Sequence, residues 1–208
     1  MFAKLSTTKS RQPHRQRRKR PSSERQLIYL IVGAAILFIL LIVLIIFVNI
    51  QRSQPVAGEE TVATLGNAHI PQNTVVTAVY NNTPPTSGPH YGSLAEWDIY
   101  TEPLPYQVLL HNMEDGGVIV YYQCPDGCPE TMEVLTEIVR AYIDRGQRVV
   151  LAPNAPGWSN GVTGHEEMGA KIAVTAWNRI LKMDEVDADR IRVFIQKYQG
   201  IDHHGIGG

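Results

Sequence analysis

An uninterrupted apolar run near the N-terminus constrains this chain more than any other feature. Residues 27–48 read LIYLIVGAAILFILLIVLIIFV, which is 22 residues without a charged residue or a proline. As a helix this run would be about 33 Å long, which matches the hydrocarbon core of a bilayer. A buried core helix would be expected to show one polar face, and this run has none. The sequence therefore predicts a transmembrane helix over residues 27–48.

Basic residues are distributed unevenly around this run. Nine of the 19 lysines and arginines precede it, and only Arg52 follows it closely. By the positive-inside rule this asymmetry predicts a cytoplasmic tail over 1–26 and a domain outside the cytoplasm. A cleaved signal peptide is the main alternative, but its apolar part is usually only about 7–15 residues long. We therefore predict a single-pass cell-membrane protein with a cytoplasmic N-terminus and an extracytoplasmic C-terminal domain.

The part of the chain beyond the apolar run is acidic. From Asn49 onward, 10 basic residues are outnumbered by 19 acidic ones, so the outer domain carries a charge near −9. An acidic surface argues against nucleic acid as its partner. The expected partners are the lipid bilayer and, as an alternative, other membrane or envelope proteins.

The outer part divides into three segments. Residues 49–65 are polar without clear periodicity and predict a linker, 66–200 predict one globular domain, and 201–208 predict a flexible tail. Strands are expected in the β-rich runs 74–80, 118–122, 148–152 and 171–177, and helices in the two segments with apolar residues at helical spacing, 129–146 and 187–200. The predicted fold class is α/β, with mixed α+β layers and a thioredoxin-like core as one version of it.

A first group of candidate functional residues consists of histidines and carboxylates. His69, His90 and His111 lie in or beside segments rich in Pro, Gly or Asn, and Glu114 and Asp115 follow the third histidine in HNMEDGG. Ordered polar side chains in loops tend to serve function rather than packing. Imidazole and carboxylate together suit a transition metal, with copper or zinc as the expected ion, or acid–base work near neutral pH. The alternative is that each histidine only hydrogen-bonds its own loop.

A second group is centred on the two cysteines of the chain, in Cys124-Pro-Asp-Gly-Cys128-Pro129. Outside the cytoplasm the simpler interpretation is a structural disulfide between Cys124 and Cys128. The alternative is redox or soft-metal chemistry, because Cys128 would lie at a helix N-terminus. The segment VIVYYQCPDGCPE locally resembles the Sco-type copper chaperones, which have a thioredoxin-like fold. That resemblance implies a metal set of Cys124, Cys128 and His165.

A longer resemblance covers about residues 69–200. The segments YNNTPPTSGPHYG, HNMEDGGVIVYY, VLAPN and IAVTAWNRILKMDEVD resemble, in this order, an uncharacterised bacterial family catalogued as domain of unknown function 3105, typically membrane-anchored. The resemblance implies no established activity. Its motifs fall on Pro84, Pro85, Thr86, Ser87, Gly88, Pro89, His90, Tyr91, His111, Asn112, Glu114, Gly116, Gly117, Ala176 and Trp177. The family commonly reads HNLEHGG, so Asp115 replaces a second histidine and favours a harder ion.

Three classes of function follow from these residues. The outer domain binds a transition metal through some of His69, His90, His111, Glu114 and Asp115, or it is a non-catalytic interaction module with a structural disulfide, or it is an extracytoplasmic thiol-redox or hydrolytic enzyme. Motifs such as GxSxG, HExxH and the phosphate-binding loop are absent from the sequence. We rank metal binding first, and the sequence alone leaves open whether the protein is an enzyme.

Overall fold

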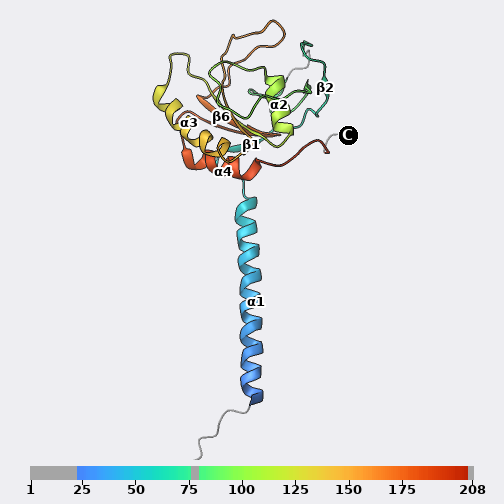
Figure 1. Ribbon diagram of the computed structural model, residues 1–208, viewed down its shortest axis with the longest axis vertical. Helices are drawn as coiled ribbons and strands as arrows, with labels where there is room; N and C mark the ends of the chain where they lie inside the picture. The colour runs from blue at the N-terminus through green and yellow to red at the C-terminus, as the bar shows by residue number, and fades with distance from the viewer. Residues whose placement is uncertain (1–22, 76–79, 206–208) are drawn as a thin grey trace, which may run out of the picture. The chain divides into compact units, whose positions relative to one another are not determined.

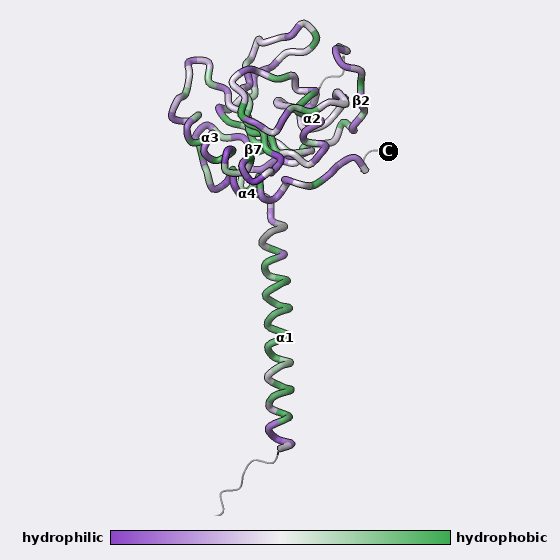
Figure 2. The backbone as a smooth tube through the Cα atoms, viewed as in Figure 1, coloured by the Kyte–Doolittle hydropathy of each residue, from purple (hydrophilic) through white to green (hydrophobic). Residues whose placement is uncertain are grey.

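The computed structural model describes residues 23–75 and 80–205, and it divides the chain into two units that meet between Ser53 and Gln54. The first unit contains α1 (Ser23–Ser53), whose stretch Ser23–Ile50 is long and apolar enough to cross a membrane. Figure 2 colours this helix hydrophobic along most of its length, and none of its most apolar window is buried. The apolar run at 27–48 is therefore helical throughout, as predicted.

The second unit is built on a five-stranded sheet (Figure 1). Its strands are β1 (Glu59–Thr61), β4 (Val118–Tyr122), β5 (Val149–Pro153), β6 (Ile172–Ala176) and β7 (Arg179–Met183), arranged in the order β1-β7-β6-β4-β5. β4 and β5 are parallel, and the other neighbours are antiparallel. β4, β5 and β6 are fully or almost fully buried, which explains why they were evident as apolar runs in the sequence.

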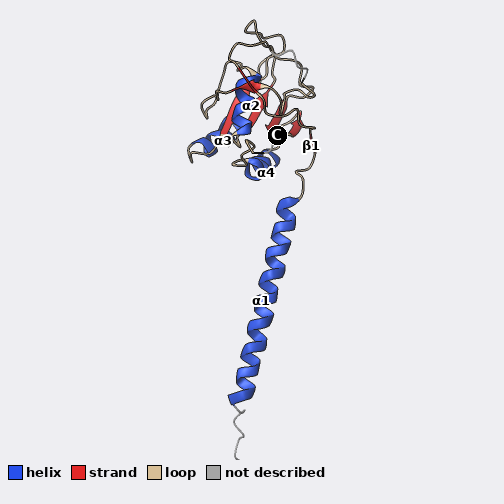
Figure 3. Cartoon of the chain, turned by 90° about the vertical axis from the view of Figure 1, so that its right-hand side faces the viewer, coloured by secondary structure: helices blue, strands red, loops and turns tan. Residues whose placement is uncertain are grey.

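Helices and loops cover the two faces of this sheet. α3 (Pro129–Ile143) and α4 (Ala188–Tyr198) bury Leu135, Ile138, Phe194 and their neighbours against one face. The other face carries α2 (Tyr106–Glu114), which packs Leu109, Leu110 and Met113 against it together with long loops (Figure 3). The fold is thus mixed α+β, as predicted, and the order β4-α3-β5 followed by β6-β7-α4 is compatible with a thioredoxin-like core.

The globular unit begins earlier than the sequence suggested. We predicted a linker over 49–65, but Val56 is buried in the core and β1 pairs with β7 at the edge of the sheet. β1 has only three residues, two of them glutamates, so it carries no alternating apolar pattern. At the other end, residues 201–205 of the predicted tail lie against α2, as detailed below, and 206–208 fall outside the described residues.

The strand expected at 74–80 is not confirmed. Thr74, Val75 and Tyr80 belong to no strand, and residues 76–79 lie outside the described part of the chain. In contrast, β2 (His69–Ile70) and β3 (His90–Tyr91), which the sequence did not predict, form a small parallel pair beside α2. This pair matters for function because each strand begins with a histidine.

Candidate metal centre

α2 presents two of the candidate ligands from one face. His111 and Glu114 are three residues apart, so they lie one above the other on the helix. Leu109, Leu110 and Met113 of the same helix are completely buried against the sheet, and this packing holds the short helix in place. We expected the segment HNMEDGG to be a loop, but its first four residues end a helix. The apolar turn before His111 is too short for the sequence pattern to indicate a helix there.

The parallel pair β2–β3 supplies the other two ligands. His69 and His90 occupy the same position in the register of this pair, so their side chains are neighbours. The pairing is extended by hydrogen bonds from the Gly88 nitrogen to the Gly66 carbonyl at 2.9 Å and from the His90 nitrogen to the Ala68 carbonyl at 3.0 Å. The buried Ser87 hydroxyl also accepts a hydrogen bond from the Leu65 nitrogen. The loop before His90 is therefore rigidly tied to the strand that carries His69.

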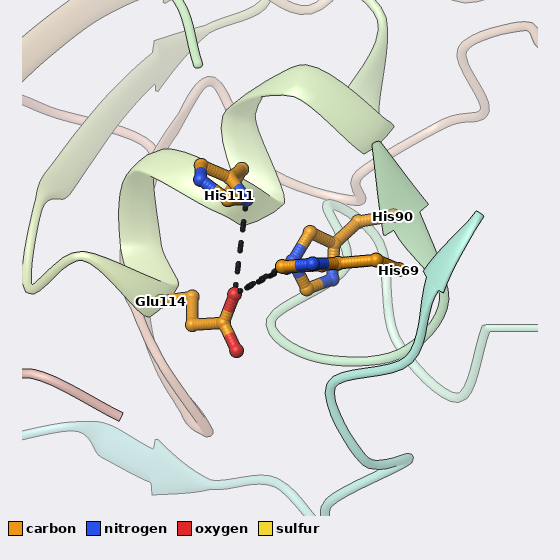
Figure 4. A group of neighbouring side chains, drawn as sticks. All are labelled: His69, His90, His111 and Glu114. Atoms are coloured by element: carbon orange, nitrogen blue, oxygen red, sulfur yellow. Dashed lines mark hydrogen bonds and ion pairs between the residues drawn. The ribbon is translucent and has the colours of Figure 1, made fainter. Parts of the chain in front are cut away.

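These elements bring three histidine side chains together around one carboxylate oxygen of Glu114 (Figure 4). Oε2 of Glu114 lies 2.9 Å from Nε2 of His90, 3.0 Å from Nε2 of His69 and 3.7 Å from Nδ1 of His111. One nitrogen or oxygen from each of the four residues lies within 4.8 Å of every other. Ligands around a tetrahedral zinc ion are about 3.3 Å apart, given metal bonds of about 2.0–2.1 Å. The group is therefore compact enough to hold a metal ion.

Neighbouring residues orient two of the four ligands. Nδ1 of His90 lies 2.8 Å from the Gly88 carbonyl, which can only accept, so this nitrogen carries the proton. Nε2 is then the nitrogen that faces the centre of the group: it donates to Oε2 of Glu114 when it also carries a proton, and it offers its lone pair to a cation when it does not. Asn67 donates to the other oxygen of Glu114 at 2.8 Å, which leaves Oε2 directed at the histidines. Such outer hydrogen bonds are typical of residues that ligate metals.

Burial and charge prepare the same residues for a cation. His90 and Glu114 are almost inaccessible, whereas 46% of the His69 side chain is exposed, so the group opens to solvent on that side. Burial alone would raise the pKa of Glu114, but hydrogen bonds from His69, His90 and Asn67 outweigh it, and the pKa is lowered. Burial lowers the pKa of His111, with smaller opposing contributions that include Asp115. A carboxylate and a neutral imidazole are the forms that bind metal ions.

His111 provides a direct indication of a missing partner. Its Nδ1 is buried and makes no hydrogen bond, although 3.7 Å separates it from the Glu114 carboxylate. Buried polar atoms without a partner are rare in proteins, and each needs an explanation. A metal ion at the centre of the group would satisfy this nitrogen, so the residues present fit a bound ion.

The C-terminal segment adds a histidine that the sequence did not single out. His111, Asp115 and His204 form a second group with one ligand atom each within 4.8 Å. From their place near the C-terminus we predicted that His203 and His204 belong to a frayed tail, in which an exposed histidine pair binds metal only adventitiously. Asp115, which we placed with the other ligands, belongs to this second group and not to the first.

The cysteines and His165 do not assemble into a metal site. Cys124 and Cys128 form a disulfide, with their Cα atoms 5.8 Å apart, so they offer no thiolate. Both ring nitrogens of His165 are already used: Nε2 donates to the Leu104 carbonyl at 2.8 Å, and Nδ1 accepts from the Ala155 nitrogen at 3.2 Å. The set Cys124, Cys128 and His165 implied by the Sco-type resemblance is therefore replaced by a disulfide and a histidine that holds loops together.

The fold and the site together define a domain with a histidine–glutamate centre able to hold a metal ion. The chain belongs to the DUF3105 family, a family of proteins of unknown function, whose model matches residues 69–205. This range starts at His69 and includes every residue of both groups. No curated protein and no solved structure matches the chain.

Proposed function

We propose that this protein is a membrane-anchored, extracytoplasmic metal-binding protein whose outer domain holds one transition-metal ion through His69, His90, His111 and Glu114. The observation that carries the proposal is the convergence of three imidazoles and one carboxylate within 4.8 Å, with Nδ1 of His111 buried and unpaired. Anchoring is supported by α1, and the outward orientation by the basic residues that precede it.

The donor set indicates which ions the centre prefers. Three nitrogens and one oxygen suit borderline ions such as zinc and copper(II) better than calcium or magnesium, which prefer oxygen ligands. The disulfide removes the thiolates that would favour copper(I). Four donors close together, three of them largely buried, favour tight binding of a single zinc or copper(II) ion.

Elemental analysis of the purified full-length chain tests the proposal. The protein would be extracted in detergent without added metal, with a tag that contains no histidine. We expect about one equivalent of zinc or copper in the wild-type protein, and less than a tenth of that in His90→Ala or His111→Ala. Saturating zinc at a hundredfold excess over its Kd should stabilise the wild-type fold by about 2.7 kcal/mol and leave His111→Ala, which removes a ligand common to both groups, unchanged.

Two control variants separate metal binding from folding. His165→Gln removes a buried histidine outside the centre, and Cys124→Ser with Cys128→Ser removes the disulfide. Both are expected to lose stability but to keep their metal. If the wild-type protein contains no metal and gains no stability from zinc or copper, the histidines are a scaffold and the proposal is wrong.

A further inference from the structure

We propose that the centre accommodates a second metal ion, bound by His111, Asp115 and His204 on the solvent side of the first; this inference rests on the proposed function. The six donors would then divide into two equal sets. His69, His90 and Glu114 would hold the inner ion, and His111, Asp115 and His204 the outer one. Each set contains two imidazoles and one carboxylate.

The donor atoms of the outer set face one another at the surface. Nε2 of His204 lies 3.6 Å from Oδ1 of Asp115 and 3.6 Å from Oε2 of Glu114. The side chain of His204 is 44% exposed and that of Asp115 is 24% exposed, in contrast to the buried Glu114. His204 is not among the residues whose ligand atoms surround the inner position. Its position therefore calls for a separate explanation.

The orientation of His204 is set by a third carboxylate. Nδ1 of His204 lies 2.9 Å from Oδ1 of Asp202, which also accepts from the His204 backbone nitrogen at 2.9 Å. With its proton on Nδ1, the neutral ring directs the Nε2 lone pair at the carboxylate oxygens of Asp115 and Glu114. A lone pair facing two hydrogen-bond acceptors is unfavourable, so this nitrogen needs either a proton or a metal ion between it and the carboxylates. Histidine ligands are commonly held by a carboxylate in this way.

The chain is built to hold His204 at this place. The His203 nitrogen donates to the Glu114 carbonyl at 2.9 Å, and the Gly200 nitrogen donates to the Gly116 carbonyl at 2.7 Å. The ring of His203 stacks on Trp177, with centroids 6.0 Å apart and an interplanar angle of 25°. A Cβ at Gly116 would lie only 2.8–2.9 Å from the backbone of Gly200 and Ile201, so the close approach requires glycine. The segment 200–205 is thus docked on the C-terminal end of α2.

Because of His111, the same six residues can bind either one ion or two. It is the residue that both groups share, and a neutral imidazole ligates one ion at a time. With one ion bound, His111 completes an inner set of four. With two, it moves to the outer ion, and each ion keeps three protein ligands and open positions for water, as in catalytic zinc sites. Oε2 of Glu114, within 3.6–3.7 Å of His204 and His111, lies where a bridging carboxylate would be.

Zinc titration of the full-length protein in detergent, followed by equilibrium dialysis, tests the second position. The wild type is expected to bind two equivalents of zinc. The second should bind at least tenfold more weakly than the first, because the ligands of the outer position are more exposed. Asp115→Asn with His204→Gln should bind one equivalent with the affinity of the first site unchanged. The matched control, Asp126→Asn with His165→Gln, alters the same residue types outside both groups and should still bind two.

Copper(II) provides a readout that needs no variant. At one equivalent we expect an ordinary single-ion EPR spectrum, and at two equivalents a signal broadened or lost through coupling between ions about 3.5–4 Å apart. Saturation of the wild type at one equivalent would overturn the inference and leave the proposed function intact. A single equivalent that binds more weakly after the His204 change would make His204 a fifth ligand, which also overturns it. No binding at all would refute the proposed function itself.

Discussion

Glu114 shows how much of this site depends on a single side chain. Its carboxylate is only 1% exposed, yet it meets four histidine nitrogens within 3.7 Å and an amide of Asn67. A buried carboxylate without such partners would be strongly destabilised, and here the surrounding donors keep it ionised. The ionised carboxylate of Glu114 is therefore well suited to bind a cation.

His165 offers a contrasting prediction at the residue scale. Burial lowers its pKa, with a smaller opposing contribution from the hydrogen bond to the Leu104 carbonyl, so the folded protein holds this ring neutral. The unfolded chain then binds the extra proton below the ordinary pKa of about 6.5. Stability is therefore full above that pH and falls as the pH drops through it, with a slope of up to about 1.4 kcal/mol per pH unit.

Chemical denaturation at pH 7.5, 6.5 and 5.5 in the presence of a metal chelator would measure this slope. His165→Gln is expected to be less stable than the wild type at pH 7.5, because two hydrogen bonds and the stacking on Tyr106 are disturbed. It should also lose less stability on acidification, since one titrating group is gone. Equal slopes for the two proteins would show that His165 is not the group responsible.

At the scale of elements, the end of α2 decides how the C-terminal segment docks. Gly116 has a φ of +78° and no room for a side chain, whereas Gly146 after α3 has a φ of +69° and nothing within 4 Å of its missing Cβ. Both glycines have a positive φ, but only at Gly116 would a Cβ meet other backbone atoms. A comparison of their alanine variants therefore isolates the docking of residues 200–205.

We expect Gly146→Ala to lower the free energy of unfolding by about 1 kcal/mol through its backbone conformation. Gly116→Ala should lower it by a further 1–3 kcal/mol or so, because the new methyl group displaces a packed backbone. Hydrogen exchange of the His203 amide, which bonds to the Glu114 carbonyl, should accelerate in Gly116→Ala only. Equal loss of stability and unchanged exchange in both variants would contradict the docked arrangement.

At the scale of the whole molecule, the two units differ in the character of their surfaces. α1 carries apolar side chains all around, whereas the unit from Gln54 onward has an ordinary buried core and an acidic excess. An oxidising compartment outside the cytoplasm is where a disulfide such as Cys124–Cys128 persists. These features support the orientation that the charge asymmetry predicts.

Protease accessibility would test that orientation. When protease is added to spheroplasts of a bacterial host, we expect the outer domain to be digested while a cytoplasmic marker protein survives. In inverted membrane vesicles the result should reverse, and detergent should abolish protection in both preparations. A domain that is protected in intact spheroplasts and cleaved in inverted vesicles would show that the chain has the opposite topology.

Much of the fold could be predicted from the sequence, because the patterns that indicate its strands and helices are local. β4, β5 and β6 are short apolar runs, and α3 and α4 have apolar residues at helical spacing, with Asp187 capping α4 through the Arg190 nitrogen. The missed elements are those that tertiary contacts stabilise. β1 is a three-residue edge strand, β7 has charged residues at two of its five positions, and α2 spans nine residues with polar side chains around its end.

The candidate ligands were also found from the sequence, because His69, His90, His111 and Glu114 stand among prolines and glycines that packing alone does not require. Whether they meet depends on contacts between distant segments, above all the pairing of β2 with β3 and the packing of α2 on the sheet. The same long-range packing separates Asp115 from the first group and brings His204 to it. Residue types and spacing determine which side chains are chemically able to ligate a metal ion. Only the tertiary structure decides which of these side chains face the same point, because their convergence depends on contacts between residues far apart in the chain.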